Sequence, residues 1–506
     1  MDIDSLLKPF QRFGVHLGLE RIQRLLADLG NPHHRVPIIH VAGTNGKGSV
    51  CAYLSAVLTE AGYRTGRYTS PHLVDWNERI CLNEQPISTE ALEQLLLQVK
   101  AAIPEDTEDS PTQFEAITAA AWLYFAQQQV DIAVIEVGLG GRLDATNVSN
   151  SPLVSIITSL SREHWQNLGP TLAHIAREKA GILKPGYPAV IGQLPPEAKV
   201  VVEQRIEELG CPAIWVKPAV ELPPPTPPYQ GGEQTEDSSP YPQGEQTEIP
   251  SSYPQGEQTE DSSSYLQGEQ TEDSSPYQQG EQTEIPSPYE EGNQQEIPPL
   301  TKGGTKGGFS HWAEYQGIKY PLPLLGDIQL MNSAIAIASL QILRSQGWNI
   351  TEEAIQNGMA KTHWLGRLQW TTWCDRKLLI DGAHNPAAAV ALRQYVDTLK
   401  TPVTWVMGIL STKDHADIFQ ALLRPRDQLY LVPVPDHSSA DPDALAILAQ
   451  NICPELTECR SYPNLETGLE AATSDPTQPS NRLIVLCGSL YLIGHFLKQH
   501  HSATHR

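Results

Sequence analysis

The stretch VPIIHVAGTNGKGSVCAYLSAVL, residues 36–58, decides the fold, because it runs from an apolar strand through a glycine-rich turn into a helix. Its turn, GTNGKGS at 43–49, departs from the usual phosphate-loop pattern G-x-x-x-x-G-K-[ST]. Gly48 follows Lys47, and the hydroxyl comes one place late, at Ser49. The N–H groups of such a turn and of a helix N-terminus still attract anions. We therefore predict a nucleotide-phosphate site rather than a plain turn with an exposed lysine.

Strands and helices alternate outward from this stretch. Apolar runs at 131–138 and 153–160 each neighbour a helical stretch, and a second series begins with RKLLI at 376–380. Apolar strands that alternate with helices are typical of parallel sheets covered on both faces. The sequence therefore predicts two α/β domains. The predicted boundaries are residues 1–217 for the first domain, 218–308 for an insert and 309–506 for a smaller second domain, with a hinge at 309–330.

The predicted insert is an acidic repeat. The pentapeptide GEQTE recurs every 12 residues from Gly232 to Gly280. Residues 221–300 hold 17 Asp or Glu and no Lys, Arg or His, which leaves only −7 of the formal net charge of −24 to the rest of the chain. Such a segment has too little apolar surface to offset its ordering entropy, so we predict disorder. A docking arm for a basic partner is one interpretation; we favour an expanded repeat tolerated in a surface loop.

Composition narrows the class of protein. The seven cysteines are scattered without a C-x-x-C pair, which argues against a disulfide framework or a cysteine zinc site and suits a reducing cytoplasm. The first residues, MDID, carry acids where a secretory signal carries bases, and no apolar run is long enough to span a bilayer. We expect a cytoplasmic protein that binds neither membranes nor nucleic acid.

Several polar residues fall at predicted strand ends, where ligands of open parallel sheets bind. Glu136 ends the strand DIAVIE, and a carboxylate there is costly unless it is paired or bound to a metal. Beside a phosphate loop, such an acid commonly serves Mg²⁺. Ser70 in TSPHL and His164 in SREHW also follow strands, but alone they are more typical of a turn and of a structural histidine. Spacing alone makes Lys179 a solvated helix residue.

The second half offers three further candidates. Arg367, in GRLQW, can neutralise phosphate charge. Asp381 and His384, in DGAHNP, end a strand before a helix that starts at a proline, and the aspartate can hold a ribose hydroxyl. Taken singly, each residue could equally be an ordinary surface residue.

Together these motifs resemble one family. HVAGTNGKGS, TSPHL, QFEAITAAA, EVGLGGRLDATN, EHWQNLGPTLAHIAREKAGILK, GRLQW, DGAHNP and GSLYLIG stand in the order found in folylpolyglutamate synthase and bacterial dihydrofolate synthase, which are Mur-ligase-like ATP-dependent ligases. The resemblance covers the chain except for about 218–308. It implies an N-terminal P-loop ATPase domain with a parallel sheet and a Rossmann-like C-terminal glutamate-ligase domain. It also implies that GTNGKGS is the family's own form of the phosphate loop.

The resemblance implies roles for individual residues. ATP would be held by Asn45, Gly46, Lys47, Gly48, Ser49, Asn332, Arg367, Asp381 and His384. Mg²⁺, as two ions, would be bound by Ser70, Glu136 and His164. The catalytic residues would be Lys47, His164 and Lys179, the last as a carbamate beside the second ion. The pterin or pteroate group would contact Thr112, Phe114, Leu143, Asp144 and Ala145.

The implied reaction is amide formation through an acyl phosphate. ATP would phosphorylate the carboxylate of dihydropteroate, or the terminal glutamate of a reduced folate, and the amine of L-glutamate would attack the product. The resemblance also implies a monomer. Two other functions are compatible with parts of the sequence. One is a Mur-type ligase for a cell-wall precursor, which SPHL and QFEAIT disfavour; the other is a nucleotide-binding scaffold without catalysis, which the retained Glu136 and Lys179 disfavour.

The chain departs from the family pattern at three places. Glu163 precedes His164 where aspartate is frequent, and Ile328 stands in GDIQLMN where histidine is usual. The segment STKDH keeps Lys413 of a D-K-D pattern but lacks its first acid. We expect the longer Glu163 side chain to shift a contact around His164, and the contacts of the Ile328 segment to differ from those of the family.

Overall fold

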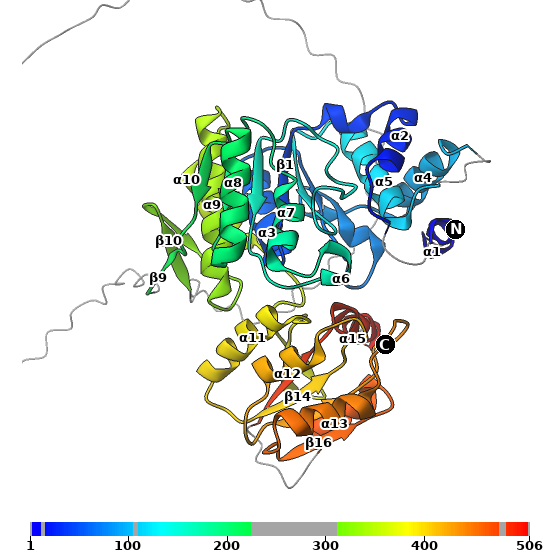
Figure 1. Cartoon of the computed structure of the whole chain (residues 1–506), viewed down its shortest axis with the longest axis vertical. Coiled ribbons are helices and arrows are strands. Elements are labelled where there is room, and N and C mark those ends of the chain that lie inside the picture. Colours follow the sequence, from blue (N-terminus) through cyan, green and yellow to red (C-terminus); the bar gives the residue numbers. More distant parts are fainter. Residues whose placement is uncertain (1–2, 12–15, 105–109, 224–310, 475–481, 504–506) are drawn as a thin grey trace, which may run out of the picture. The chain divides into compact units, whose positions relative to one another are not determined.

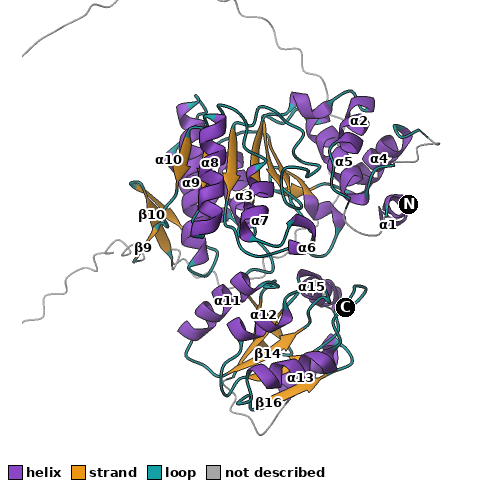
Figure 2. Cartoon of the chain, in the orientation of Figure 1, coloured by secondary structure: helices purple, strands orange, loops and turns teal. Residues whose placement is uncertain are grey.

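A computed structural model describes residues 3–11, 16–104, 110–223, 311–474 and 482–503 of the chain (Figure 1). The predicted insert at 218–308 lies outside the described residues, apart from 218–223. The described part contains two large sheets with helices on both faces and one small antiparallel sheet (Figure 2). The predicted α/β class with parallel sheets is confirmed.

The first sheet holds the phosphate-loop stretch. Its described strands run in the order β4-β3-β2-β5-β1-β6-β7-β8. Their bounds are β1 (Ile38–Ala42), β2 (Thr65–Tyr68), β3 (Ile80–Leu82), β4 (Gln85–Pro86), β5 (Ile132–Glu136), β6 (Val154–Ile157), β7 (Ala189–Ile191) and β8 (Ala213–Trp215). The neighbouring strands in the run β2-β5-β1-β6-β7-β8 pair in parallel. At the edge of the sheet, β3 is antiparallel to both β2 and β4. Because β1 lies between β5 and β6, the chain segments that leave these three strands meet at one edge.

Alternating side chains of this sheet face two helical layers. Ile132 and Val134 of β5 pack in one core with α3 (Lys47–Glu60), α9 (Ile328–Ser345) and α10 (Glu352–Lys361). Ala133 and Ile135 of the same strand pack in another core with α4 (Thr89–Ala101) and α5 (Gln113–Gln127). The strands β6 and β7 are covered by α7 (Leu172–Ala180) and α8 (Pro196–Leu209). This period of two is what a sheet buried on both faces requires.

The small sheet changes the predicted boundary of the second domain. Its order is β11-β10-β9, with β9 (Val220–Leu222) antiparallel to β10 (Trp312–Tyr315) and β10 antiparallel to β11 (Ile318–Pro321). The helices α9 and α10 follow and pack on α3 of the first sheet. Residues 312–361 therefore belong to the first core, and the predicted start at 309 lies too early. Apolar helices do not reveal from their sequence which sheet they cover.

The second large sheet has the order β12-β13-β17-β14-β15-β16 within the described residues. Its strands are β12 (Gln369–Trp373), β13 (Arg376–Ile380), β14 (Val403–Met407), β15 (Gln428–Leu431), β16 (Glu458–Ser461) and β17 (Leu483–Cys487). All neighbours pair in parallel except β12, which is antiparallel to β13. One face is covered by α11 (Pro386–Thr398), α12 (His415–Leu422) and α13 (Pro442–Ile452), and the other by α14 (Leu465–Ser474) and α15 (Leu490–Ala503).

The other described helices are short or lie at the periphery. They are α1 (Ile3–Leu7), α2 (Glu20–Asp28), α6 (Trp165–Leu168) and the 3₁₀ turns at Lys8–Phe10, Pro32–Arg35 and Trp76–Arg79. None of the helices among the described residues combines the length and apolar character needed to cross a bilayer.

Candidate functional site

The phosphate loop owes its form to three glycines that touch neighbouring residues. A Cβ on Gly43 would lie 1.9 Å from the hydroxyl of Thr158, and one on Gly46 would lie 2.3 Å from Oδ1 of Asn332. A Cβ on Gly48 would lie 2.4 Å from the ring of Trp364. Gly46 also has a φ of 88° at the start of α3, which favours glycine. Gly48 therefore departs from the usual loop pattern for a packing reason.

The loop after β6 holds the phosphate loop in shape. The amide N–H of Thr44 donates to the carbonyl of Ser159 at 2.7 Å. The hydroxyls of Thr158 and Ser159 both donate to the carbonyl of Asn45, at 2.7 and 2.9 Å. These bonds occupy the carbonyl side of the loop. The first turn of α3 begins directly after Gly46, so its N–H groups open toward the cavity.

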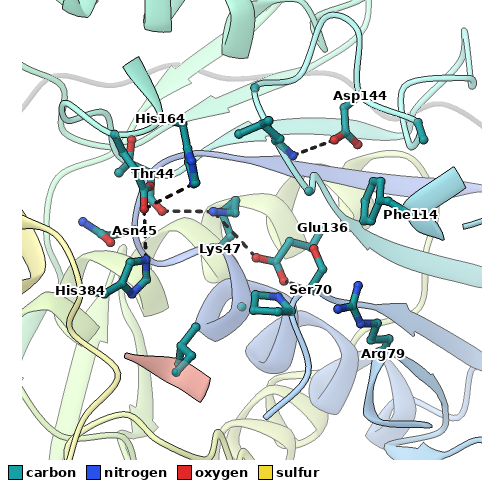
Figure 3. Close-up of a pocket in the computed structure, with 18 of the residues that line it drawn as sticks. Thr44, Asn45, Lys47, Ser70, Arg79, Phe114, Glu136, Asp144, His164 and His384 are labelled. Carbon is teal, nitrogen blue, oxygen red and sulfur yellow. Dashed lines mark hydrogen bonds and ion pairs between the residues drawn. The ribbon is translucent and has the colours of Figure 1, made fainter. Parts of the chain in front are cut away.

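Two lysines converge on this loop beside a buried carboxylate, and Figure 3 shows one of them, Lys47, next to the carboxylate of Glu136. The ammonium of Lys47 donates to the carbonyls of Gly43 and Thr44, both at 3.1 Å, and lies 3.9 Å from Oε1 of Glu136. The ammonium of Lys179 donates to the carbonyl of Gly43 at 2.7 Å. Lys179 is buried, so the helical spacing that suggested a solvated residue was misleading. The site thus brings two ammonium groups and one carboxylate together in a largely buried position.

Burial perturbs both kinds of charge. It lowers the pKa of Lys179 to about 7, and the positive charge of Lys47 acts in the same direction. Burial also raises the pKa of Glu136, against the opposing effects of Lys47 and of the N–H that Ser70 donates to its carboxylate at 3.2 Å. Perturbed groups gathered in one cavity are typical of functional sites.

The predicted metal ligands lie around the same cavity. Glu136 is the last residue of β5, and Ser70 follows β2. His164 lies at the N-cap directly before α6 with a φ of 50°, and burial lowers its pKa to about 4. No group of three His, Cys, Asp or Glu within the described residues is arranged to hold a metal ion. The predicted set contains only one carboxylate, so its metal role stays a prediction.

One cavity of about 560 Å³ brings most predicted residues together. The predicted residues that line it are Asn45, Gly46, Lys47, Gly48, Ser49, Ser70, Thr112, Phe114, Glu136, Leu143, Asp144, Ala145, His164, Lys179, Arg367 and His384. Asn332 and Asp381 do not line it. Asn332 is buried against Gly46, and Ile328 is 39% exposed at the start of α9. Their predicted contacts with a nucleotide remain predictions.

The apolar end of the cavity is built on α5 and the loop after β5. Thr112 caps α5, and the ring of Phe114 packs so closely on Gly138 that a Cβ there would lie 2.3 Å away. Asp144 is buried, and its two oxygens accept bonds from the N–H of Leu139 at 2.7 Å and the hydroxyl of Thr146 at 2.6 Å. Asp144 therefore shapes its own loop as well as lining the cavity.

The second sheet adds residues from the loops after β13 and β14. Asp381 accepts N–H bonds from Leu368 at 2.9 Å and Ala383 at 2.8 Å, which ties together the segments that carry Arg367 and His384. Asn385 caps α11 and exchanges two amide hydrogen bonds with Asn45, at 3.2 and 3.0 Å. The phosphate loop is therefore in direct contact with residues of the second sheet.

Glu163, in the loop after β6, contacts His384 and Lys413 from the loops of the second sheet. Its burial opposes ionisation, but the hydrogen bond to His384 and the charges of His384, Lys413 and His164 outweigh that effect and hold its pKa well below the ordinary value. The sequence singled out Glu163 only as a departure from the family pattern. Its contacts with the second sheet were not expected.

Arg79 and Trp364 are among the cavity residues that the sequence did not single out. Arg79 is buried, stacks on Trp76 with 4.4 Å between the guanidinium carbon and the ring centroid, and donates to Nδ1 of His72 at 2.9 Å. Trp364 packs on Gly48. A single arginine or tryptophan in a loop carries no spacing signal. Only the neighbouring GRLQW motif marks the Trp364 segment as worth attention.

Family models match both large sheets. The model described as "Mur ligase middle domain" matches residues 41–204, and the model described as "Dihydrofolate synthetase, C-terminal domain" matches residues 367–499. The second match begins at Arg367, immediately before β12, which agrees with the structural start of the second sheet.

Full-length relatives decide the family. The chain is 33% identical to folylpolyglutamate synthase of Lacticaseibacillus casei, over 96% of this chain and 95% of that protein. It is 31% identical to dihydrofolate synthetase of Saccharomyces cerevisiae, over 96% of this chain and 99% of that protein. The chain belongs to the folylpolyglutamate synthase and dihydrofolate synthase family. Among solved structures, Escherichia coli FolC in complex with DHPP and ADP aligns with a TM-score of 0.71 and 25% identity, over 99% of this chain and 97% of that one.

The resemblance inferred from the motifs is confirmed by these relatives. Neither of the two full-length relatives is named as a ligase of cell-wall precursors, so the comparisons favour the folate branch over the cell-wall alternative.

Proposed function

We propose that this chain is an ATP-dependent ligase that joins L-glutamate to a folate precursor or a folate. The acceptor is the carboxylate of dihydropteroate, the terminal glutamate of a reduced folate, or both. The main support for the proposal is that Lys47 and Lys179 both contact the glycine loop, with Lys47 close to the buried Glu136. These residues line a cavity that also has apolar residues in its lining. The relatives' names and the ADP in the FolC structure support it.

ATP is expected to bind with its phosphates over the first turn of α3. The first N–H groups of a helix have no acceptor within the helix and can donate to phosphate oxygens. Lys47 needs only to leave the two carbonyls that it contacts. The negative charge of the transferred phosphoryl group grows in a partly water-excluded site, where a fixed cation stabilises it strongly. Arg367, from the segment before β12, supplies a second cation in the cavity lining.

The residues around Glu136 fit a magnesium ion. The carboxylate and the hydroxyl of Ser70 are oxygen donors, which Mg²⁺ prefers. Glu136 is buried in the cavity lining with an N–H bond from Ser70 and Lys47 at 3.9 Å, and burial of so weakly compensated a carboxylate is costly without a further cation. Bound there, Mg²⁺ would offset phosphate charge. His164 is a less natural ligand for this ion.

Lys179 is suited to the carbamylation that the resemblance implies. With a pKa lowered to about 7, a large share of its amine is neutral near neutral pH and can attack carbon dioxide. The product, a carbamate and a released proton, would turn a buried cation into an anion beside Lys47. Labelling with ¹³C-carbon dioxide and observing the carbamate carbon by NMR tests this step. Absence of the signal in the parent, or its persistence in Lys179→Met, contradicts it.

The apolar end suits the acceptor substrate. Phe114 and Leu143 add apolar side chains to the cavity lining that a pterin ring can pack on, and the polar Thr112 and Asp144 line the same cavity. The acceptor carboxylate attacks the γ-phosphorus of ATP and ADP leaves. The amine of L-glutamate then attacks the acyl carbon, phosphate leaves, and the amine proton passes to a base or to water. The acyl phosphate must be protected from water, which a cavity formed from both sheets provides.

The experiment is ADP release with ATP, Mg²⁺ and L-glutamate, comparing 7,8-dihydropteroate with a reduced folate. Release with both acceptors means a bifunctional enzyme, and release with one assigns the acceptor. No glutamate-dependent release with either would overturn the proposal. Lys47→Ala is the matched control, because it should lose ligation and keep the fold; near-parent turnover of that variant would also contradict the proposal.

A further inference from the structure

The loop after β6 presents one carboxylate oxygen to residues of the second sheet. Oε1 of Glu163 lies 3.1 Å from Nε2 of His384 and 3.5 Å from the ammonium of Lys413. The amide nitrogen of Asn385 lies 3.5 Å from the same oxygen. His384 and Asn385 come from the loop after β13, and Lys413 from the loop after β14. Three loops of two sheets thus meet at one atom.

The contact lies between two cavities. The cavity of about 560 Å³ and a neighbouring cavity of about 330 Å³ share a wall formed by Glu163, His164, His384, Thr412 and Lys413. The side chain of Glu163 is 9% exposed and that of Lys413 is 13% exposed, so their attraction is little screened by solvent. A charged pair of this kind fixes the position of the loops that carry it.

His384 is held from both ends of its ring. Its Nδ1 faces the carbonyl of Gly382 at 2.8 Å, and its Nε2 faces Glu163. Two acceptor oxygens on opposite sides of an imidazole leave it one orientation. Without Glu163, the ring would keep only the bond within its own loop, and that loop would be tied to the first sheet through Asn385 and Asn45 but no longer through His384.

We propose that Glu163 is a positioning residue that clamps His384 and Lys413 at the wall between the two cavities. This inference rests on the proposed function, because the benefit of the clamp is catalytic. A cation that is already in place when negative charge develops, here the ammonium of Lys413, needs no reorganisation during the reaction. The clamp therefore acts on turnover more than on nucleotide binding, since the phosphate loop itself belongs to the first sheet.

The glutamate side chain matches the distance it spans. Aspartate is shorter by one methylene, about 1.5 Å, and the contacts of Glu163 already lie at 3.1 and 3.5 Å. With the backbone in place, an aspartate carboxylate would end beyond hydrogen-bonding distance of His384. In this chain the clamp thus requires the longer acid that departs from the family pattern.

The test compares Glu163→Gln and Glu163→Asp with Glu314→Gln. Glu314 forms an exposed pair with Lys319 at 3.9 Å on the small sheet, so its variant controls for loss of an unrelated ion pair. A charge-assisted hydrogen bond corresponds to about 10- to 100-fold in an equilibrium. We expect kcat to fall by about that factor in both Glu163 variants, with ADP affinity changed less than about threefold. The control should match the parent.

Hydrogen exchange provides a second measurement that does not need turnover. Amides at 382–386 and 410–414 should exchange faster in Glu163→Gln than in the parent, while those of β1 and α3 stay unchanged. Unchanged exchange in these loops overturns the clamp, as does a kcat within twofold of the parent or a fully active Glu163→Asp. A parent without glutamate-dependent ADP release would instead overturn the proposed function, and hydrogen exchange would still decide whether the clamp exists.

Discussion

Replacing Lys179 with methionine should stabilise the protein while removing its ligase activity. The lysine is buried, and burial lowers its pKa from 10.5 to about 7, with Lys47 acting in the same direction. Between these two pH values the unfolded chain binds a proton that the folded chain does not bind. The free energy of unfolding therefore rises with pH across this window, and it is lowest where Lys179 is charged in the fold.

The magnitude follows from the two pKa values. At about 1.4 kcal/mol per pKa unit, the lysine lowers the free energy of unfolding at pH 7 by about 4 kcal/mol. Methionine has a similar length and no charge, but it loses the hydrogen bond to Gly43, which costs about 1.5 kcal/mol. That carbonyl keeps its bond from Lys47 at 3.1 Å, so it is not left without a donor. The net expected gain at pH 7 is about 2.5 kcal/mol.

The assay is urea unfolding followed by tryptophan fluorescence at pH 7 and pH 9, in buffers free of carbon dioxide. The parent should gain about 2 kcal/mol more than Lys179→Met between these pH values, because its lysine approaches neutrality in both states at higher pH. Arg177→Met, on the same helix, is the matched control and should show no such difference. Equal pH dependence of parent and Lys179→Met, or a less stable variant at pH 7, would refute the reasoning.

Three further perturbations test separate features. Lys47→Met should lower kcat by about 100-fold or more, as loss of a preorganised charge donor does, with little change in thermal midpoint; a tenfold or smaller loss contradicts the role of Lys47 on the phosphates. Gly48→Ala should lower ATP affinity, because its Cβ would lie 2.4 Å from the ring of Trp364 and the two groups must separate by about 1 Å to reach ordinary contact. Binding of a non-hydrolysable ATP analogue measures this affinity, and an affinity equal to that of the parent contradicts the prediction. Replacing residues 224–310 with a two-residue turn should leave ligation within twofold of the parent, because β9 and β10 pair directly at Leu222 and Trp312; a larger loss would instead favour a functional arm.

The sequence predicted the parts of the site that lie at strand ends. Glu136 ends β5 as expected, and its neighbour in register, Val41, lies two residues before Gly43, the first residue of the phosphate loop. This success is physical: side chains that leave adjacent parallel strands share one edge, so the strand pattern alone brings them together. The glycine-rich turn was also recognisable, because its strand and helix flanks restrict what such a turn can do.

The parts that the sequence could not predict depend on contacts between distant segments. Gly48 must be a glycine because the ring of Trp364 packs on it. Nothing in the sequence around either residue predicts this contact. The helices α9 and α10 cover the first sheet although they follow the insert, because apolar faces match any apolar sheet. Lys179 resembled a solvated helix residue, and only packing against Gly43 reveals its burial. Local patterns record propensity and period, whereas these features are set by tertiary packing.

The buried charges also explain why the site needs so many supporting bonds. Glu136, Asp144 and Lys179 are each buried, and each would favour its neutral form without partners. Asp144 is compensated by N–H and hydroxyl donors of its own loop, so the fold alone can stabilise it. Glu136 and Lys179 have fewer such bonds, and the missing compensation must come from what binds. The burial of Glu136 and Lys179 therefore lowers the stability of the unliganded fold. Binding of a phosphate and its metal ion is favoured because it relieves this cost.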